Sequence, residues 1–256
     1  MALVASVSSA KGGSGKSTTS LNLGVSLANL GRDVTIIDAN LSTPYLSMYL
    51  GAPNVPVTLH HVLRGNANIL EAVYKHASGT KIVPGSISMR DFEDINIDDL
   101  QLHLPQIKSD IIILDAAPGL DREAQGPIKM ADEVLIVTTP ELPSVAQALK
   151  TIRLAQKFDK PVTGVVLTRA GHDLDLKIKN IETILEHPII GIIPEDHQIK
   201  KALIKREPIT HILPNAPSSV AYQKLAAYLT GHNFEPVLHS SPNKFFKFVK
   251  WSFGVR

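Results

Sequence analysis

Short runs of apolar residues alternate with stretches of helical periodicity along the chain. Seven runs rich in valine and isoleucine have the length of β-strands, at residues 3–7, 34–37, 81–83, 111–114, 134–137, 162–167 and 189–193. Apolar positions spaced as on one face of a helix occur between several of them, notably over residues 21–30, 59–74 and 145–158. Near-continuous apolar strands are typical of parallel sheets that are buried on both faces. The pattern therefore predicts an α/β fold with a mostly parallel, twisted sheet flanked by helices on both faces, and ligand binding beyond the C-terminal ends of the strands.

Composition restricts the possible classes of protein. At 256 residues and 44% hydrophobic content, a single folded domain of residues 1–231 is the simplest organisation. The chain has no cysteine, which excludes disulfides, thiolate metal sites and iron–sulfur ligation. A net charge of +2 gives little support for electrostatic binding of nucleic acid by the protein as a whole. No apolar run reaches the roughly 18 residues of a membrane span, and the first apolar run has no basic region before it, so we interpret it as a strand and not as a signal peptide.

The segment after the first strand is a deviant Walker A box, K-G-G-S-G-K-S-T at residues 11–18. A plain phosphate loop has a glycine where Ala10 stands, and this variant adds the lysine Lys11. The strand before it and the helical pattern after it, ended by Gly31, supply the setting that the motif requires. Backbone N–H groups and the N-terminus of a helix attract phosphates. We expect the phosphates of a nucleoside triphosphate at Gly12, Gly13, Ser14, Gly15, Lys16, Ser17 and Thr18, with Lys16 on the β- and γ-phosphates and Ser17 on Mg²⁺.

Acidic residues end two of the predicted strands. Asp115 follows the run at residues 111–114, and its carboxylate is expected to hold Mg²⁺ through a coordinated water, as in a Walker B strand. Gly119 stands where a backbone N–H can approach the γ-phosphate. Asp38 ends the second strand, where it can face Mg²⁺ or the attacking water, or serve as a turn or cap aspartate.

These motifs resemble the MinD/ParA family of deviant Walker ATPases and, within it, the MinD branch. The resemblance covers nearly the whole chain, and besides the phosphate loop it includes L-H-H-V-L-R-G at residues 59–65, T-P-E at 139–141, L-T-R at 167–169 and I-P-E-D at 193–196. It implies an ATP-dependent sandwich homodimer in which Lys11 reaches the phosphates bound to the partner subunit. It also implies that Thr168, Arg169, Pro194 and Asp196 surround adenine, and that Glu141 lies at the dimer interface near the partner's ribose. For Glu141 and Arg169, a role as solvated surface residues remains the alternative.

One position departs from the family pattern. MinD proteins with brisk hydrolysis carry D-x-D at the end of the second strand, whereas this chain has Asp38-Ala39-Asn40. An amide can accept a hydrogen bond from the attacking water but cannot take its proton. Because phosphoryl transfer depends mainly on positioning and electrostatics, we expect ATP hydrolysis to be slow but present. The sequence D-A-N-L at residues 38–41 resembles MinD-like proteins of archaea.

The last residues form a second candidate site. Residues 232–242 are rich in proline and small polar residues and predict a flexible linker, and residues 243–256 predict an amphipathic helix that targets the membrane. Four of the chain's 7 Phe residues and its only Trp lie in this tail. On a helical projection the apolar side carries Phe245, Phe246, Phe248, Val249 and Phe253, the opposite side carries Lys244, Lys247 and Lys250, and Trp251 lies near the boundary. The alternative is a C-terminal helix packed on the sheet.

Several functions fit these features to different degrees. The first is a MinD-type ATPase, cytoplasmic and peripheral on the inner face of the cell membrane, that works on anionic lipid and with an unidentified activator or cargo protein. A ParA-type DNA-partitioning ATPase needs a basic surface, for which Lys200, Lys201, Lys205 and Arg206 are the candidates. A FlhG-type flagellar-positioning ATPase also fits the amphipathic tail. Nitrogenase reductase and Mrp-type cluster carriers need cysteines, and a polysaccharide tyrosine kinase would end in a tyrosine-rich tail, whereas no tyrosine follows Tyr228.

Overall fold

The computed structural model describes residues 2–49, 51, 55–88, 95–171 and 175–232. The predicted tail and all but the first residue of the predicted linker lie outside these residues. Eight strands form one sheet in the order β3-β4-β2-β5-β1-β6-β7-β8. Their bounds are β1 Leu3–Ser8, β2 Val34–Ala39, β3 Tyr74–Lys75, β4 Lys81–Val83, β5 Ile111–Ala116, β6 Glu133–Thr138, β7 Val162–Ala170 and β8 Ile189–Pro194. Every pairing is parallel except the one between β3 and β4, so the predicted mostly parallel α/β sheet is confirmed.

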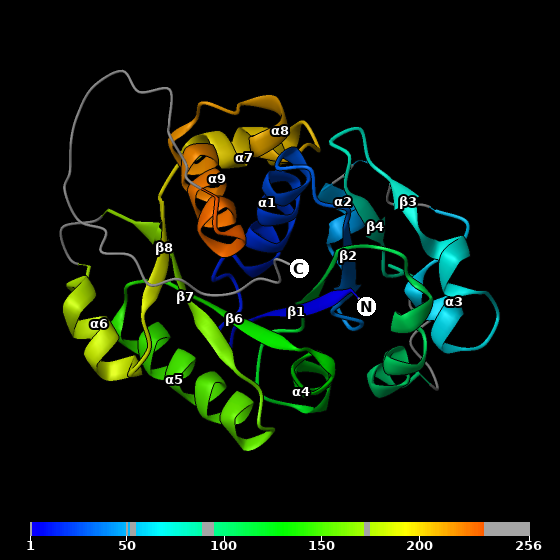
Figure 1. Cartoon of the computed structure of the whole chain (residues 1–256), viewed down its shortest axis with the longest axis horizontal. Coiled ribbons are helices and arrows are strands. Elements are labelled where there is room, and N and C mark those ends of the chain that lie inside the picture. Colours follow the sequence, from blue (N-terminus) through cyan, green and yellow to red (C-terminus); the bar gives the residue numbers. More distant parts are fainter. Residues whose placement is uncertain (1, 50, 52–54, 89–94, 172–174, 233–256) are drawn as a thin grey trace.

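Helices cover both faces of the sheet (Figure 1). The helices are α1 Lys16–Asn29, α2 Leu46–Tyr49, α3 Leu59–Leu63, α4 Arg122–Met130, α5 Leu142–Lys157, α6 Ile178–Leu185, α7 His197–Ile204, α8 Ile209–Ile212 and α9 Pro217–Thr230, with 3₁₀ turns η1 Ile69–Ala72, η3 Ile97–Leu102 and η4 Leu104–Gln106. Helices α1 and α9 pack side by side on one face, together with α7 and α8, and α4 and α5 cover the other (Figure 1). None of the helices among the described residues is long and apolar enough to cross a membrane.

Alternating residues of the central strands supply the two faces of the core. On β5, Ile113 packs under α1 and α9 with Leu21 and Leu225, whereas Ile112 and Leu114 belong to the cluster on the opposite face. Strands β1, β2 and β5 are therefore buried between two helical layers, as their unbroken apolar runs predicted. This burial fixes the ends of the strands rigidly, and the loops after them carry the candidate site.

The helix predicted over residues 59–74 is wrong beyond its first five residues. Helix α3 ends at Leu63, and Gly65 follows with φ of 76°, a left-handed conformation that ends a helix readily. The chain then forms η1 and the short strand β3, which begins at Tyr74. Apolar spacing alone did not reveal this interruption because Ile69 and Ala72 are also buried, at positions that continue the helical spacing.

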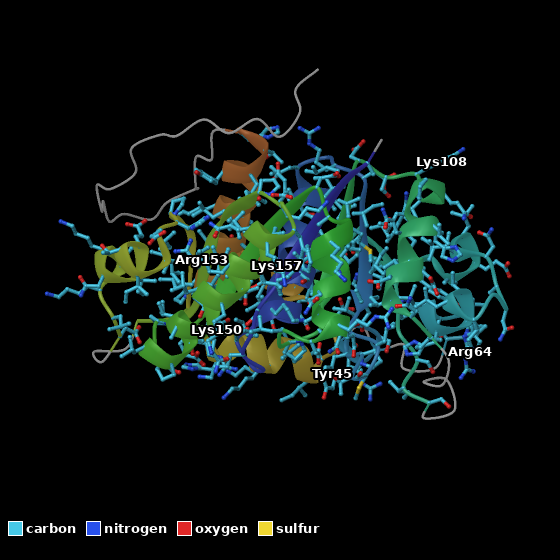
Figure 2. All side chains as sticks on the ribbon, turned by 90° about the horizontal axis from the view of Figure 1, so that it is seen from below. Tyr45, Arg64, Lys108, Lys150, Arg153 and Lys157 are labelled. Atoms are coloured by element: carbon cyan, nitrogen blue, oxygen red, sulfur yellow. The ribbon has the colours of Figure 1, made fainter. Side chains whose placement is uncertain are left out.

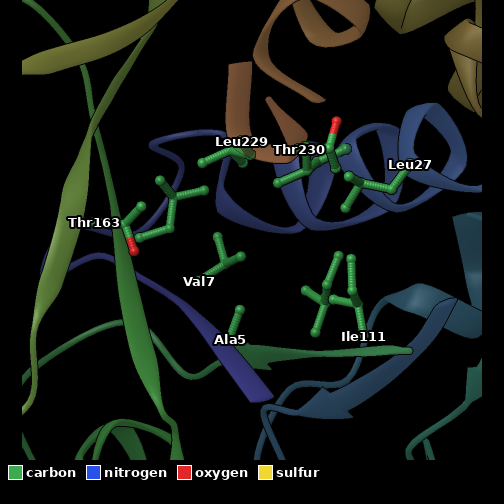
Figure 3. Close-up of a pocket in the computed structure, with 10 residues that line it drawn as sticks. Ala5, Val7, Leu27, Ile111, Thr163, Leu229 and Thr230 are labelled. Carbon is green, nitrogen blue, oxygen red and sulfur yellow. The ribbon is translucent and has the colours of Figure 1, made fainter. Parts of the chain in front are cut away.

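A small apolar cavity of about 20 Å³ lies between the sheet and the α1–α9 layer (Figure 3). Figure 3 shows Ala5, Val7 and Ile111 of the sheet facing Leu27 of α1 and Leu229 of α9 across it. This volume holds about one water-sized sphere, and the lining offers a water almost no polar partner. The cavity is a packing defect near the N-terminal ends of the strands and not a ligand site.

Candidate nucleotide site

The Walker A box connects the end of β1 to the start of α1. Gly13 and Gly15 have φ of 76° and 84°, left-handed values that glycine adopts without strain. Gly15 is the N-cap of α1 and has no side chain that could cap the helix. The first turn of α1 also contains no acidic residue. The positive end of the helix dipole thus has no acidic side chain or side-chain cap, and an anion can bind there.

Lys16 and Asp115 form a buried ion pair. Lys16 Nζ donates to Asp115 Oδ1 over 2.9 Å, and the two side chains are 7% and 1% exposed. Ser20 Oγ donates to the same carboxylate oxygen over 2.9 Å. The sequence had predicted Lys16 for phosphate and Asp115 for Mg²⁺, and the structure brings the two residues together at one point. Each supplies the charge that the other lacks when neither phosphate nor metal is bound.

Asp38 lies opposite Asp115 in register on the neighbouring strands β2 and β5. Its Oδ2 accepts a hydrogen bond from Leu46 N over 2.9 Å, whereas its buried Oδ1 has no hydrogen-bond partner among the described residues. Burial, together with the nearby Asp115 carboxylate, raises the pKa of Asp38 to about 8. A buried carboxylate oxygen without a partner is an unfavourable arrangement that a cation would relieve.

These features match the requirements of a magnesium site. Carboxylate and hydroxyl oxygens are the ligands that Mg²⁺ prefers, usually with several waters retained. Asp38 and Asp115 end adjacent strands, and Ser17 begins the first turn of α1 beside Lys16. Ser17, Asp115 and Asp38 therefore remain the candidates to hold Mg²⁺, directly or through water.

Asn40 is bonded within its own loop. Its Nδ2 donates to Thr43 O over 2.6 Å, and its Oδ1 accepts from Thr43 Oγ1 over 3.1 Å. The amide is 4% exposed and both of its functional atoms are used locally. Sequence reasoning placed Asn40 beside the attacking water, and it did not anticipate that Thr43 would engage the amide.

Lys11 is held by the N-terminal part of α5. Its Nζ donates to Glu141 Oε2 over 2.8 Å and to Ser144 Oγ over 2.9 Å. Hydrogen bonding to Lys11 is the main reason that the pKa of Glu141 is lowered. The two charged side chains stay 40% and 60% exposed, so this contact is open to solvent and to exchange. Glu141 is thus an ion-pair partner of Lys11 within the same chain.

Gly119 links the segment after β5 to the Walker A box. Its N–H donates to Ser9 O over 3.2 Å, and its φ of 113° is a value that residues with a side chain rarely adopt. The glycine predicted to approach the γ-phosphate is therefore next to the phosphate loop.

The residues predicted for adenine divide into two groups. Thr168 Oγ1 donates to Ser14 O over 2.6 Å, so Thr168 contacts the phosphate loop itself. Asp196 caps α7 by accepting from Gln198 N over 2.9 Å, and it accepts from Ser218 Oγ over 2.8 Å. Burial opposes ionisation of Asp196, but the hydrogen bonds from Gln198 and Ser218 outweigh it and lower its pKa. Pro194 is half-buried at the end of β8, and Arg169 is exposed with φ of 52°.

An open groove of about 300 Å³ adjoins this second group. It is lined by Gln198 of α7 and by residues 212–217, which connect α8 to α9. Its size is at the lower limit for small-molecule pockets. Sequence reasoning missed the residues at 212–217, although the prolines Pro214 and Pro217 mark a turn there.

The phosphate loop joins β1 to α1, and acidic residues lie near the ends of β5, which pairs with β1, and of β2, which pairs with β5. This arrangement defines a P-loop nucleotide-binding protein. Residues 5–209 match the family described as the CobQ/CobB/MinD/ParA nucleotide binding domain. An uncharacterized ATP-binding protein of Methanocaldococcus jannaschii is 35% identical over 260 residues, which cover 100% of this chain and 98% of that protein.

Two solved structures are similar over most of the chain. The cell division ATPase MinD of Pyrococcus furiosus superposes with a TM-score of 0.85 at 31% identity, covering 88% of this chain and 97% of that one. The septum site-determining protein MinD of Pyrococcus horikoshii, complexed with Mg-ADP, superposes with a TM-score of 0.84 at 29% identity and covers 88% and 95% of the two chains. The protein belongs to the MinD/ParA family of P-loop ATPases, close to MinD and to archaeal MinD-like proteins.

Proposed function

We propose that this protein is a MinD-type ATPase that dimerises with ATP, binds the membrane through residues 243–256 and is released when ATP is hydrolysed. On the membrane it would position other machinery, such as the cell-division site or another cellular structure. The observation that carries the proposal is the second lysine of the Walker A box. Lys11 is 40% exposed, and among the residues that the structure describes its ammonium is held by the exposed Glu141 and by Ser144, so it is available to a ligand outside its own phosphate loop.

The nucleotide would occupy a path across the C-terminal ends of the strands. Its phosphates would lie at residues 12–18, with Mg²⁺ near Ser17, Asp38 and Asp115, and its base would extend along Thr168 and Pro194 toward the groove at residues 212–217. The binding of phosphate and metal requires the Lys16–Asp115 pair to open. Hydrolysis would be slow, because Asn40 cannot act as a base.

Membrane binding would depend on valency. Each lysine near an anionic surface contributes about 1 kcal/mol, so a single short helix binds weakly. Two tails on one ATP-bound dimer gain effective concentration, which raises avidity by roughly 10²–10⁴-fold. ATP would then control membrane residence at the cytoplasmic face by controlling dimerisation.

Co-sedimentation with vesicles tests this proposal. We expect binding that requires ATP, increases with the anionic lipid fraction, and is lost when the residues after Asn243 are deleted or when Phe248 and Trp251 are both replaced by Glu. Leu102→Glu is the matched control, because Leu102 is 74% exposed on η3, far from the tail in sequence, and its replacement should leave binding intact. If the truncated protein sediments with vesicles as the full chain does, the tail is not the anchor.

A ParA-type DNA-partitioning ATPase is the second candidate. Lys200, Lys201, Lys205 and Arg206 are all exposed on or just after α7, and no ion pair among the described residues involves them. If the ATP-bound protein binds duplex DNA in a salt-dependent manner and does not bind vesicles, the result supports the ParA-type function instead of the MinD-type function. A FlhG-type role shares the membrane behaviour and would be distinguished by the cargo that the ATP-bound dimer captures.

A further inference from the structure

The loop after β2 carries Asp38 and Asn40 and is held from several sides. Within the loop, Asn40 bonds Thr43, and Leu46 N donates to Asp38. From α3, the fully buried His60 contacts Leu41 O through Nε2 over 3.1 Å. These contacts fix residues 38–41 against the core. They do not involve the next residue, the exposed Ser42.

Glu123 of α4 binds Ser42 through both carboxylate oxygens. Its Oε1 accepts from Ser42 N over 2.8 Å, and its Oε2 accepts from Ser42 Oγ. Hydrogen bonds to an ionised acceptor are stronger than neutral ones, and the bidentate arrangement also fixes orientation. The two residues are 81 positions apart in sequence, so the contact joins two separate segments of the site.

Helix α4 is itself anchored to the nucleotide site. It follows β5 and Asp115, and the segment between them contains Gly119, whose N–H donates to Ser9 O at the start of the phosphate loop. Strands β2 and β5 are already paired where Asp38 faces Asp115. The contact between Ser42 and Glu123 is a second connection, beyond the end of the sheet, and it joins the loop after β2 to the first turn of α4. Asn40 lies in the short stretch between these two connections.

We propose that Glu123 is a positioning residue for ATP hydrolysis, which couples the loop after β2 to α4 through Ser42 and thereby holds Asn40 in place. This inference rests on the proposed function for its catalytic consequence. The chain lacks a carboxylate at position 40, so catalysis depends on how accurately the amide of Asn40 is placed. A loop that moves independently of α4 would place this amide less accurately.

Glu123 could also act merely as an acid in the first turn of α4, where it stabilises the helix dipole. Replacement by Gln separates these two roles. Glutamine keeps an acceptor for Ser42 N and gains a donor for Ser42 Oγ, so Glu123→Gln retains the coupling but loses the charge. Glu123→Ala loses both. Arg122→Ala, one residue earlier on the same turn and 74% exposed, is the matched control.

The experiment measures steady-state ATP hydrolysis and amide hydrogen exchange of residues 41–47 for the wild type, these three variants, Ser42→Ala and the Ser42→Ala/Glu123→Ala double variant. We expect Glu123→Ala to lower kcat roughly three- to tenfold with KM for ATP unchanged, the scale of one lost hydrogen bond. Exchange at residues 41–47 should rise, and the double variant should be no worse than Glu123→Ala alone. Glu123→Gln should stay within about twofold of the wild type, and Arg122→Ala should match it.

The inference is overturned if Glu123→Ala leaves both kcat and exchange unchanged, if Glu123→Gln is as impaired as Glu123→Ala, or if the Ser42 and Glu123 effects simply add. Hydrogen exchange measured without nucleotide tests the coupling between the loop after β2 and α4 independently of ATP hydrolysis. A wild type that binds but does not hydrolyse ATP would contradict the proposed function and the catalytic role of Glu123, while exchange would still show whether Glu123 holds the loop.

Discussion

Asp38 and Asp115 occupy paired positions on β2 and β5, and Lys16 forms its ion pair with Asp115. The Lys16 ammonium satisfies Asp115, whereas Asp38 Oδ1 has no hydrogen-bond partner among the described residues. When two carboxyl groups lie next to each other in a buried site, ionising both is unfavourable, because the like charges repel each other. Burial and the Asp115 carboxylate therefore raise the pKa of Asp38 and favour its protonated form.

This arrangement predicts a specific dependence of stability on pH. The pKa of Asp38 is about 8 in the folded protein against an ordinary value of 3.8. Between these values the folded state binds more protons than the unfolded state, so the free energy of unfolding falls as the pH rises from about 4 to about 8. The side chain of Asp38→Asn cannot lose a proton, so the free energy of unfolding of this variant should depend less on pH. The difference in the free energy of unfolding, variant minus wild type, should therefore be more positive at pH 8 than at pH 5.

Urea unfolding without nucleotide or Mg²⁺ at the two pH values measures the effect. Asp99→Asn, an exposed aspartate on η3, is the control and should retain the wild-type slope. If Asp38→Asn and the wild type show the same dependence on pH, Asp38 is ionised in the free protein.

Lys16→Ala is expected to lower the affinity for ATP by roughly 10- to 100-fold, because a hydrogen-bonded charge on the phosphates is lost. It should also destabilise the free protein by about 3–5 kcal/mol, since the 1%-exposed Asp115 would lose its cation. Isothermal titration and thermal unfolding measure the two effects. Lys150→Ala, on the exposed side of α5 (Figure 2), should change neither. Wild-type ATP affinity in the Lys16 variant would refute the assignment of the phosphate loop.

Lys11→Ala is expected to bind ATP with near wild-type affinity but to stay monomeric, because Lys11 is bonded to Glu141 and not to its own phosphate loop. Light scattering with and without ATP tests the prediction, and Lys157→Ala, another exposed lysine of α5, provides the control (Figure 2). A wild-type protein that binds ATP yet has equal mass in both conditions would exclude the sandwich dimer.

Asn40→Asp is expected to raise basal turnover several-fold, because it places a carboxylate where a D-x-D motif carries one. Phosphate release on vesicles is the measurement. Asn66→Asp, exposed after α3, controls for the added charge. An unchanged or lower rate would show that residue 40 does not orient the water.

The sequence was sufficient to predict the features that depend on local patterns. The strand before Lys11, the glycines of the phosphate loop and the apolar run that ends at Asp115 all occupy the predicted places. A local pattern misled only where Gly65 interrupts the helix that begins at Leu59. Here the tertiary contacts of η1 outweighed the helical spacing.

The pairings within the site could not be predicted in the same way. Lys16 is 99 positions from Asp115, Lys11 is 130 from Glu141, and Ser42 is 81 from Glu123. No spacing rule connects residues so far apart, because their proximity follows from the order of strands in the sheet and from the packing of α4 and α5. The sequence predicted ligand contacts for several of these residues, and the structure shows which side chains they contact within the chain.

The Lys16–Asp115 pair has a consequence for how nucleotide and metal bind. Phosphate alone would take Lys16 and leave Asp115 as an uncompensated buried anion, and Mg²⁺ alone would take Asp115 and leave Lys16 as an uncompensated buried cation. When both arrive, each buried charge exchanges one partner for another and none is left unmatched. ATP and Mg²⁺ should therefore bind with positive cooperativity, and by thermodynamic reciprocity each should raise the affinity for the other by the same factor.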